Sequence, residues 1–234
     1  LLLGGLYLSD GQHLQAGAIF EQLLKQNVSA PVRNRAWFYL GKVWYQRGYW
    51  VEAERALRKV EGTLSPGLDA ERHNLLAQVA MEQGRYDDAI AQLSGWQGPA
   101  DWNAYSRFNL GVALVRKGRL ADAAVLLNSV GQLNTEAEEL LALKDKANLA
   151  LGFAYLQANQ PEQAKLVLQR VRLQGPQSNK ALLALGWADA AGEHYSEALV
   201  PWAELQGRNL LDAAVQESYL AVPYAFARLE ANAQ

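Results

Sequence analysis

The stretch WFYLGKVWYQRGYWVEAERAL, residues 37–57, decides the fold of this chain. Its apolar residues recur three, four and seven positions apart, which places them on one face of a helix. Gly48 falls between two such patterns, and glycine adopts the positive φ of a tight turn at low cost. The stretch therefore predicts two short antiparallel helices joined by a turn.

The same pattern recurs along the whole chain. A leucine followed by Gly or Ala returns every 34 to 41 residues, and we call that small residue the anchor. The anchors are Gly4, Gly41, Ala77, Gly111, Gly152, Gly186 and Ala221. A turn residue stands seven positions later, at Gly11, Gly48, Gly84, Gly118, Asn159 and Glu193. An alanine stands twelve positions later, at Ala16, Ala53, Ala89, Ala123, Ala164 and Ala198. A large apolar residue stands sixteen positions later, at Phe20, Leu57, Leu93, Leu127, Leu168 and Trp202.

A period of this length predicts an all-α, right-handed α-solenoid of stacked antiparallel helix pairs. We expect about six repeats and one extra helix in a single solenoid: residues 1–30, 31–66, 67–100, 101–134, 135–176, 177–209 and a partial repeat at 210–234. The expected helix pairs are 1–10 with 12–26, 31–47 with 49–60, 69–83 with 85–95, 101–117 with 119–130, 137–158 with 160–172, and 177–191 with 194–206. A thirteenth helix is expected at 210–230. The small alanines should sit at close contacts between helices, where a larger side chain does not fit.

The second unit resembles the tetratricopeptide repeat family. Trp37, Leu40, Gly41, Trp44 and Gly48 follow its pattern, with Trp44 where a tyrosine is usual, and Ala53 and Leu57 complete it. The fifth unit repeats the match with Leu151, Gly152, Tyr155, Ala164, Leu168 and Pro176. The resemblance implies a surface for protein partners rather than a defined chemistry.

Composition excludes several classes of function. The 22 basic and 24 acidic residues are mixed, so no stripe for nucleic acid or a membrane surface is expected. The chain has no cysteine, which rules out disulfides and thiolate metal sites. No apolar run reaches the ~18 residues of a membrane span. His13, His73 and His194 fall in different repeats, so we expect no metal site, and His73 is interpreted as a packing residue. No catalytic motif or cofactor site is found, so the chain is expected not to be an enzyme.

Both ends of the chain look interrupted, and we interpret it as part of a longer protein. Leu1, Leu2 and Leu3 stand at one end and Leu220, Val222, Tyr224 and Phe226 at the other, where a complete solenoid would turn a polar face to water. Exposed ends of this kind would also allow self-association.

In the family that the chain resembles, the first helix of each pair lines an inner groove. The matching slots lie three before, one after and four after each anchor. As binding residues we predict Phe38, Lys42, Tyr45, Asn74, Gln78, Met81, Phe108, Val112, Val115, Leu149, Phe153, Leu156 and Trp187; Leu183 and Ala190 occupy the remaining slots. Twelve of these fifteen are apolar or aromatic, unlike the Lys, Arg and Asn of relatives that clamp a terminal carboxylate.

Two interpretations of this apolar groove stay open. An external partner with an apolar face, a peptide or a helix, could bind there, or another part of the full-length protein could cover it. The leading hypothesis is a non-catalytic scaffold of a bacterial envelope or multiprotein assembly. Its Ala-, Leu- and Gln-rich repeats resemble those of exported bacterial repeat proteins, which favours a periplasmic or envelope-associated location over a cytoplasmic one. The alternative is a regulatory or substrate-recruiting module attached to a catalytic domain outside this segment.

Overall fold

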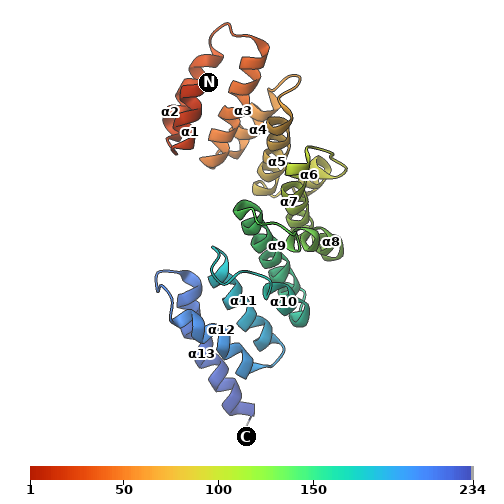
Figure 1. Ribbon diagram of the computed structural model, residues 1–234, viewed down its shortest axis with the longest axis vertical. Coiled ribbons are helices and arrows are strands. Elements are labelled where there is room, and N and C mark those ends of the chain that lie inside the picture. Colours follow the sequence, from red (N-terminus) through yellow and green to blue (C-terminus); the bar gives the residue numbers. More distant parts are fainter. Residues whose placement is uncertain (233–234) are drawn as a thin grey trace. The chain divides into compact units, whose positions relative to one another are not determined.

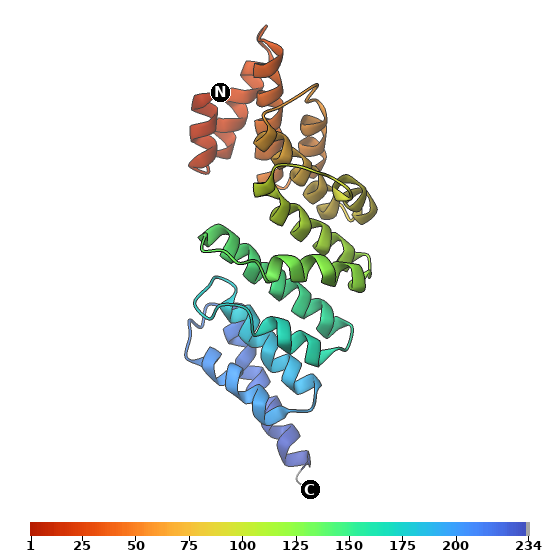
Figure 2. The same cartoon turned by 45° about the vertical axis from the view of Figure 1, so that its right-hand side comes forward.

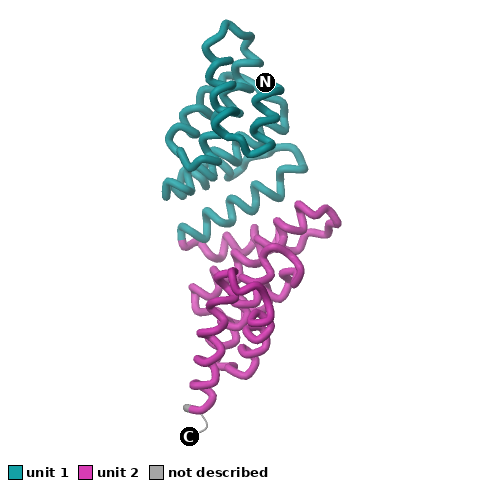
Figure 3. Tube along the Cα trace, turned by 90° about the vertical axis from the view of Figure 1, so that its left-hand side faces the viewer, with its two compact units in different colours: residues 1–117 teal, residues 118–234 magenta. Residues whose placement is uncertain are grey.

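The computed structural model describes residues 1–232, which form two compact units. Unit 1 comprises residues 1–117 and unit 2 begins at residue 118, as Figure 3 shows. The boundary falls at the turn that follows the fourth predicted first helix. Whether the units form one continuous stack stays a prediction, and residues 233 and 234 of the predicted last segment lie outside the described residues.

Unit 1 consists of seven α-helices and one short 3-10 turn, η1 (Figure 1). In chain order these are α1 (Leu2–Ser9), α2 (His13–Leu24), α3 (Ala30–Gln46), α4 (Trp50–Arg58), α5 (Pro66–Glu82), α6 (Tyr86–Leu93), η1 (Ala100–Trp102) and α7 (Asn103–Arg116). The odd-numbered helices up to α7 are the first members of the predicted pairs.

Unit 2 contains six helices, which follow one another through the unit in chain order (Figure 2). They are α8 (Leu120–Gly131), α9 (Glu138–Gln157), α10 (Pro161–Leu168), α11 (Ser178–Ala191), α12 (Tyr195–Gln206) and α13 (Ala213–Asn232). Here α9, α11 and α13 are first helices of pairs. Each of the thirteen helices falls on a predicted one, residues 1–232 contain no strand, and the prediction of a helical solenoid is confirmed. No described helix is both long and apolar enough to cross a bilayer.

The repeated small residues permit close packing within helix pairs of each unit. A Cβ added to Gly41 would lie 2.7 Å from Cγ of Leu57, the large residue sixteen positions later. A Cβ on Gly152 would lie 2.5 Å from Leu168 in the same way. The six alanines twelve positions after the anchors are all fully buried. In these two pairs the first helix therefore presents a glycine where the second presents a buried leucine, and the predicted burial of the small alanines is confirmed.

The six predicted turn residues all adopt positive φ. Four are glycines, for which this backbone conformation carries little strain. The other two are Asn159, with φ 54°, and Glu193, with φ 63°. Asparagine tolerates this region better than most residues, whereas glutamate at such a position is uncommon. The geometry of the turn is thus kept even where the sequence departs from glycine.

Polar side chains of two first helices form hydrogen bonds with the backbone that follows the second helix of the same pair. Asn34 of α3 exchanges two hydrogen bonds with the backbone of Glu61, one of them from Glu61 N to Asn34 Oδ1 at 3.2 Å. Asp145 of α9 accepts a bond of 3.1 Å from the backbone N of Arg172. Both acceptors stand seven residues before their anchor, and both partners stand twenty residues after it. The sequence analysis did not identify this slot, because its residue is alanine in the repeats of Ala77 and Gly111.

Neighbouring first helices contact one another directly within each unit: α3 with α5, α5 with α7, α9 with α11, and α11 with α13. The second helices pack between successive first helices, as α4 does between α3 and α5 and α12 does between α11 and α13. The surface of the first helices that points away from the second helices is called the inner face below.

The seventh anchor was predicted at Ala221, and the structure shifts it by two residues. Ser218, Ala221 and Ala225 of α13 are buried against the preceding repeat. In α11 the equivalent residues are Ala181, Ala184 and Ala188, which stand five before, two before and two after Gly186. The same pattern places the seventh anchor at Pro223, and Leu220, the expected core leucine, is 77% exposed. The prediction was wrong because α13 has Val222-Pro223 where the other repeats have Leu followed by a small residue.

Candidate functional site

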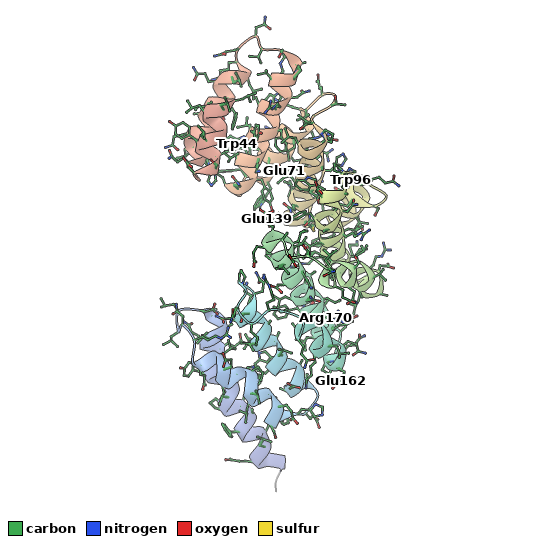
Figure 4. All side chains as sticks on the ribbon, in the orientation of Figure 1. Trp44, Glu71, Trp96, Glu139, Glu162 and Arg170 are labelled. Carbon is green, nitrogen blue, oxygen red and sulfur yellow. The ribbon has the colours of Figure 1, made fainter. Side chains whose placement is uncertain are left out.

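The polar groups on the inner face of unit 1 bond to one another. Lys42 of α3 forms an ion pair with Glu71 of α5. Figure 4 labels Glu71. Next to this pair, Gln78 Nε2 donates to Asn109 Oδ1 of α7 at 3.4 Å. Two of the predicted binding residues, Lys42 and Gln78, therefore already have partners within the unit.

A buried network of amides joins α5 to α7 below that surface. Asn74 Nδ2 donates to Ser106 Oγ at 3.0 Å, and Asn109 Nδ2 donates to Asn74 Oδ1 at 2.9 Å. The second proton of the Asn74 amide goes to the carbonyl of Ala70 at 3.0 Å. All three side chains are at least nine-tenths buried. Since buried amides are costly to leave unpaired, this network fixes the register of the two helices. Asn74 acts within the structure and offers little surface to a partner.

The apolar residues predicted in unit 1 differ in how much surface they present. Phe38 is fully buried among Leu57 and Val60, so it belongs to the core. Tyr45 is half-buried and packs on Trp50, with 5.3 Å between the ring centroids. Burial, and to a lesser extent the charge of Glu82, raises the pKa of Tyr45. The half-buried residues of this group are Tyr45, Met81, Phe108, Val112 and Val115.

Unit 2 presents a more apolar inner face, formed by α9, α11 and α13. The corrected register of α13 places Leu220 and Tyr224 in the slots three before and one after the anchor, beside the predicted residues of α9 and α11. Phe153, Tyr224 and Leu220 are 41%, 40% and 77% exposed. Leu149 and Ala190 are buried beneath this surface. We call the remaining set the apolar belt: Phe153, Leu156, Leu183, Trp187, Leu220 and Tyr224.

Trp187 lies in the middle of the apolar belt and is held from three sides. Its ring packs edge-on against Trp202, with 4.9 Å between centroids, and lies 5.9 Å from the ring of Tyr224. Its indole nitrogen donates a hydrogen bond of 2.8 Å to Glu217 Oε1 on α13. Since this bond uses the only polar group of the side chain, the exposed part of Trp187 offers apolar surface alone. The indole is thus oriented before any partner arrives, which lowers the entropic cost of binding.

Charged side chains border one edge of the apolar belt. The slot six before the anchor holds Lys146 in α9, Lys180 in α11 and Glu217 in α13. All three residues are exposed. Lys180 interacts with Asp212, whereas no ion pair of Lys146 is found within the described part of the chain. The edge is therefore positive over α9 and α11.

The histidines do not form a site. His73 lies 5.6 Å from the ring of Trp96 between centroids, and its Nδ1 is 2.6 Å from Gln92 Nε2, which confirms a packing role. Burial lowers the pKa of His73, against an opposing effect of Asp69. Across residues 1–232, no group of three or more His, Asp or Glu side chains could hold a metal ion.

This fold and these faces define a helical-repeat protein with a surface for protein partners. Comparison with known families places it more narrowly. Two tetratricopeptide repeat models match the chain, one at residues 1–69, 53–105 and 74–130 and the other at residues 146–178. The chain belongs to the tetratricopeptide repeat family, and this supports a protein–protein interaction module. None of the curated proteins matches the chain.

Solved structures share the fold at low sequence identity. The crystal structure of PilW, described as a widely conserved type IV pilus biogenesis factor, is 18% identical, with a TM-score of 0.69 over 92% of this chain and 94% of that one. The apo form of RapI is 13% identical, with a TM-score of 0.64 over 93% and 69% of the two chains. YrrB, described as having an unusual peptide-binding site, is 18% identical, with a TM-score of 0.54 over 85% and 88%. At these identities the likeness concerns the fold alone.

The sequence analysis missed three residues of the unit 2 face: Leu220, Tyr224 and Glu217. All three lie on α13, whose register was misplaced by two residues. A usable signal was present, since Ser218, Ala221 and Ala225 repeat the small-residue spacing of Ala181, Ala184 and Ala188. That spacing marks the face of a first helix that packs on the preceding repeat.

Proposed function

We propose that this chain is a non-catalytic scaffold that binds an apolar segment of a partner protein on the apolar belt of unit 2. The observation that carries the proposal is the set of exposed side chains around Trp187. Phe153, Leu220 and Tyr224 each expose two fifths or more of their surface on one face of three adjacent helices. Contiguous exposed apolar surface of this kind usually marks a contact site.

The paired polar groups on the inner face of unit 1 support the choice of unit 2. The Lys42–Glu71 pair and the amide network of unit 1 are satisfied internally, so a partner would gain little by replacing those bonds. The apolar belt instead leaves apolar side chains exposed to solvent, and a partner would bury them. Apolar contact surface also predicts that binding changes only modestly with salt, because screening acts on charges.

A photo-crosslinking experiment on the full-length protein in its host cells tests the proposal. The crosslinking amino acid is placed at Phe153 or Leu220 in the apolar belt, and at Val200 as a control. Val200 is 71% exposed on α12 and lies outside the inner face. We expect adducts with another protein from the two belt positions and not from Val200. Equal adducts from all three positions would contradict the proposal, and adducts within the same chain would show that the full-length protein covers this face.

We also propose a setting in a bacterial envelope or multiprotein assembly, supported by the Ala-, Leu- and Gln-rich composition of the repeats. Fractionation of cells that express the tagged full-length protein would test it, and recovery in the cytoplasmic fraction alone would contradict it.

A further inference from the structure

Half-buried arginines in this protein are paired with carboxylates, with one exception. Four of them form an ion pair with Asp or Glu: Arg72, Arg85, Arg172 and Arg208. Arg47 is half-buried as well, yet within residues 1–232 its side chain forms neither an ion pair nor a hydrogen bond. A guanidinium carries a positive charge and five N–H donors. Arg47 therefore keeps a bonding capacity that the chain itself does not use.

Two aromatic rings hold Arg47 in place. Its Cζ lies 5.0 Å from the ring centroid of Trp44, which is labelled in Figure 4, and 4.8 Å from that of Tyr49. The two rings meet nearly at right angles, with 5.4 Å between their centroids and 88° between their planes. An arginine stacked on aromatic rings can still bond a carboxylate through two parallel N–H groups. The guanidinium is thus oriented in advance, which lowers the entropic cost of binding an anion.

The repeat pattern shows which group is missing beside Arg47. Lys117 stands in the same slot, six positions after its anchor, and forms an ion pair of 2.7 Å with Asp87. Asp87 stands ten positions after the preceding anchor. The residue equivalent to Asp87 in the first repeat is Leu14, which is 66% exposed. The position that holds a carboxylate beside Lys117 therefore holds an exposed apolar side chain beside Arg47.

Leu14, Arg47 and Tyr49 form what we call the turn site. Tyr49 is 46% exposed and directly precedes α4. The turn site lies where the chain passes from α3 to α4, outside the three slots that line the inner face. It combines a cation that lacks an acceptor with two exposed apolar side chains. A ligand that fits it carries one negative charge next to an apolar group.

The surroundings of the turn site favour a carboxylate over a phosphate group. Arg47 supplies a single positive charge, and the exposed Glu52 stands three residues after Tyr49 in the first turn of α4. A phosphate monoester carries close to two negative charges at neutral pH, which Glu52 would repel and one guanidinium would not balance. Because Arg47 is half-buried against two rings, an acidic side chain can reach it while the backbone of the ligand stays outside.

We infer that the turn site of unit 1 binds an Asp or Glu side chain of a partner protein, with Arg47 bonding the carboxylate and with Leu14 and Tyr49 covering an apolar residue next to it. This contact goes beyond the proposed function, because it lies on a different unit from the apolar belt and depends on charge. It gives the scaffold a second point of attachment, which is specific for an acidic residue and is weakened by salt.

An NMR titration of the isotope-labelled chain with synthetic peptides tests the inference. The signals followed are the Nε–H group of Arg47 and the backbone N–H of Gly48. Short peptides, blocked at both ends, carry Glu-Leu, Gln-Leu or Glu-Ser at the centre of an otherwise uncharged sequence. We expect the Glu-Leu peptide to bind roughly tenfold more tightly than the Gln-Leu peptide, which lacks the charge, and severalfold more tightly than the Glu-Ser peptide, which lacks the apolar contact. Salt should weaken the two glutamate peptides and leave the Gln-Leu peptide unchanged.

Four variants locate the effect. Arg47→Gln should remove the preference for the Glu-Leu peptide over the Gln-Leu peptide. Arg47→Lys keeps the charge but not the planar fork of N–H groups, so it should retain only part of that preference. Leu14→Ser should abolish the advantage of Glu-Leu over Glu-Ser alone. Arg55→Gln is the matched control, because Arg55 is exposed in α4 and the loss of its charge should leave every preference unchanged.

Equal binding of the Glu-Leu and Gln-Leu peptides, or equal effects of Arg47→Gln and Arg55→Gln, would overturn the inference. A further peptide lacks Asp and Glu but ends in leucine with a free carboxylate. If it binds as tightly as the Glu-Leu peptide, the site takes a terminal carboxylate and the inference of an acidic side chain is wrong. Thermal denaturation shows whether each variant is folded; if Arg47→Gln is not, an undiminished preference in Arg47→Lys would overturn the inference. The crosslinking at Phe153 and Leu220 involves no residue of the turn site, so either proposal can fail without the other.

Discussion

Gly41 of α3 faces Leu57 of α4 so closely that an added Cβ would lie 2.7 Å from Leu57 Cγ and 2.8 Å from its Cδ2. Leu57 is fully buried. The backbone carbonyl of Ala53 lies on the same side, at 3.3 Å from the added atom. The repeat thus trades the helix propensity of one residue for close approach of the paired helices.

Gly41→Ala should destabilise the protein by about 1–3 kcal/mol, because the methyl group overpacks a closed contact. Gly5→Ala is the matched control, since Gly5 also lies in a first helix but has nothing within 4 Å of an added Cβ. That change should be neutral or stabilising by up to about 1 kcal/mol, because alanine is the better helix former. Chemical denaturation measures both. A smaller loss for Gly41→Ala than for Gly5→Ala would contradict the packing described.

Ala123→Leu should destabilise by about 1–3 kcal/mol for the same reason. Ala123 is fully buried in α8, whereas Ala121 is exposed in the same helix. Ala121→Leu therefore adds the same side chain with the same helix propensity but no clash. Its free energy of unfolding should stay within about 0.5 kcal/mol of that of the parent. Equal midpoints for the two variants would show that the twelve-residue slot does not mark a tight contact.

The helical repeat was predictable because close packing leaves a periodic trace of small and large residues. Gly41, Ala53 and Leu57 show it within seventeen residues, and the turns at Asn159 and Glu193 were found from position alone. The surface was less predictable. Phe38 occupies an inner-face slot in the repeat pattern, yet it is fully buried among Leu57 and Val60. Its exposure depends on how neighbouring repeats cover it, which the period does not encode.

The register of the last helix, α13, was also not predictable from the anchor pattern. The anchor pattern reports how a first helix meets its own second helix, and α13 has Pro223 at that position instead of a small residue after leucine. Its packing on α12 through Ser218, Ala221 and Ala225 follows a different set of positions. Because the apolar belt depends on the register of α13, the sequence identified Phe153 and Trp187 but not Leu220.

Asp212 should make the stability of unit 2 sensitive to acid. It accepts a 2.8 Å bond from the backbone N of Ala214 in the first turn of α13. A hydrogen bond from Asn179 lowers the pKa of Asp212 below its usual 3.8, and hydrogen bonds from the backbone of α13 lower it further. Partial burial acts in the opposite direction but does not cancel this effect. A lowered pKa in the folded state means that the stabilisation is complete above the unfolded pKa and is lost as pH falls through the folded one.

Asp212→Ala should therefore cost about 1 kcal/mol at pH 7, the usual effect of losing such a cap. The difference from the parent should shrink as the pH falls below 3.8. Asp212→Asn keeps an acceptor for the backbone and should lose less at pH 7. Denaturation midpoints across pH 2–7 (roughly the range in which carboxyls titrate) measure this. A constant difference between Asp212→Ala and the parent over the whole range would show that the charge of Asp212 plays no part.

Replacing Leu220 or Phe153 by alanine should separate binding from stability. Leu220 is 77% exposed, so its change should alter the free energy of unfolding by no more than about 0.5 kcal/mol, whereas Phe153 is 41% exposed and its change should cost about 1–2 kcal/mol through lost burial. If they contact an apolar segment of a partner protein, each change should lower the affinity for that segment about tenfold, which is about 1.4 kcal/mol of binding free energy. Val200→Ala removes an apolar side chain that is 71% exposed on α12, outside the inner face, and should change neither quantity. Anisotropy titration with a fluorescent leucine-rich peptide gives the affinities, and thermal denaturation gives the stabilities. Equal affinities for the Val200, Leu220 and Phe153 variants would place the partner elsewhere on the molecule. A drop of several degrees in the melting temperature of the Leu220 variant would instead assign that side chain to the core and restore Ala221 as the anchor.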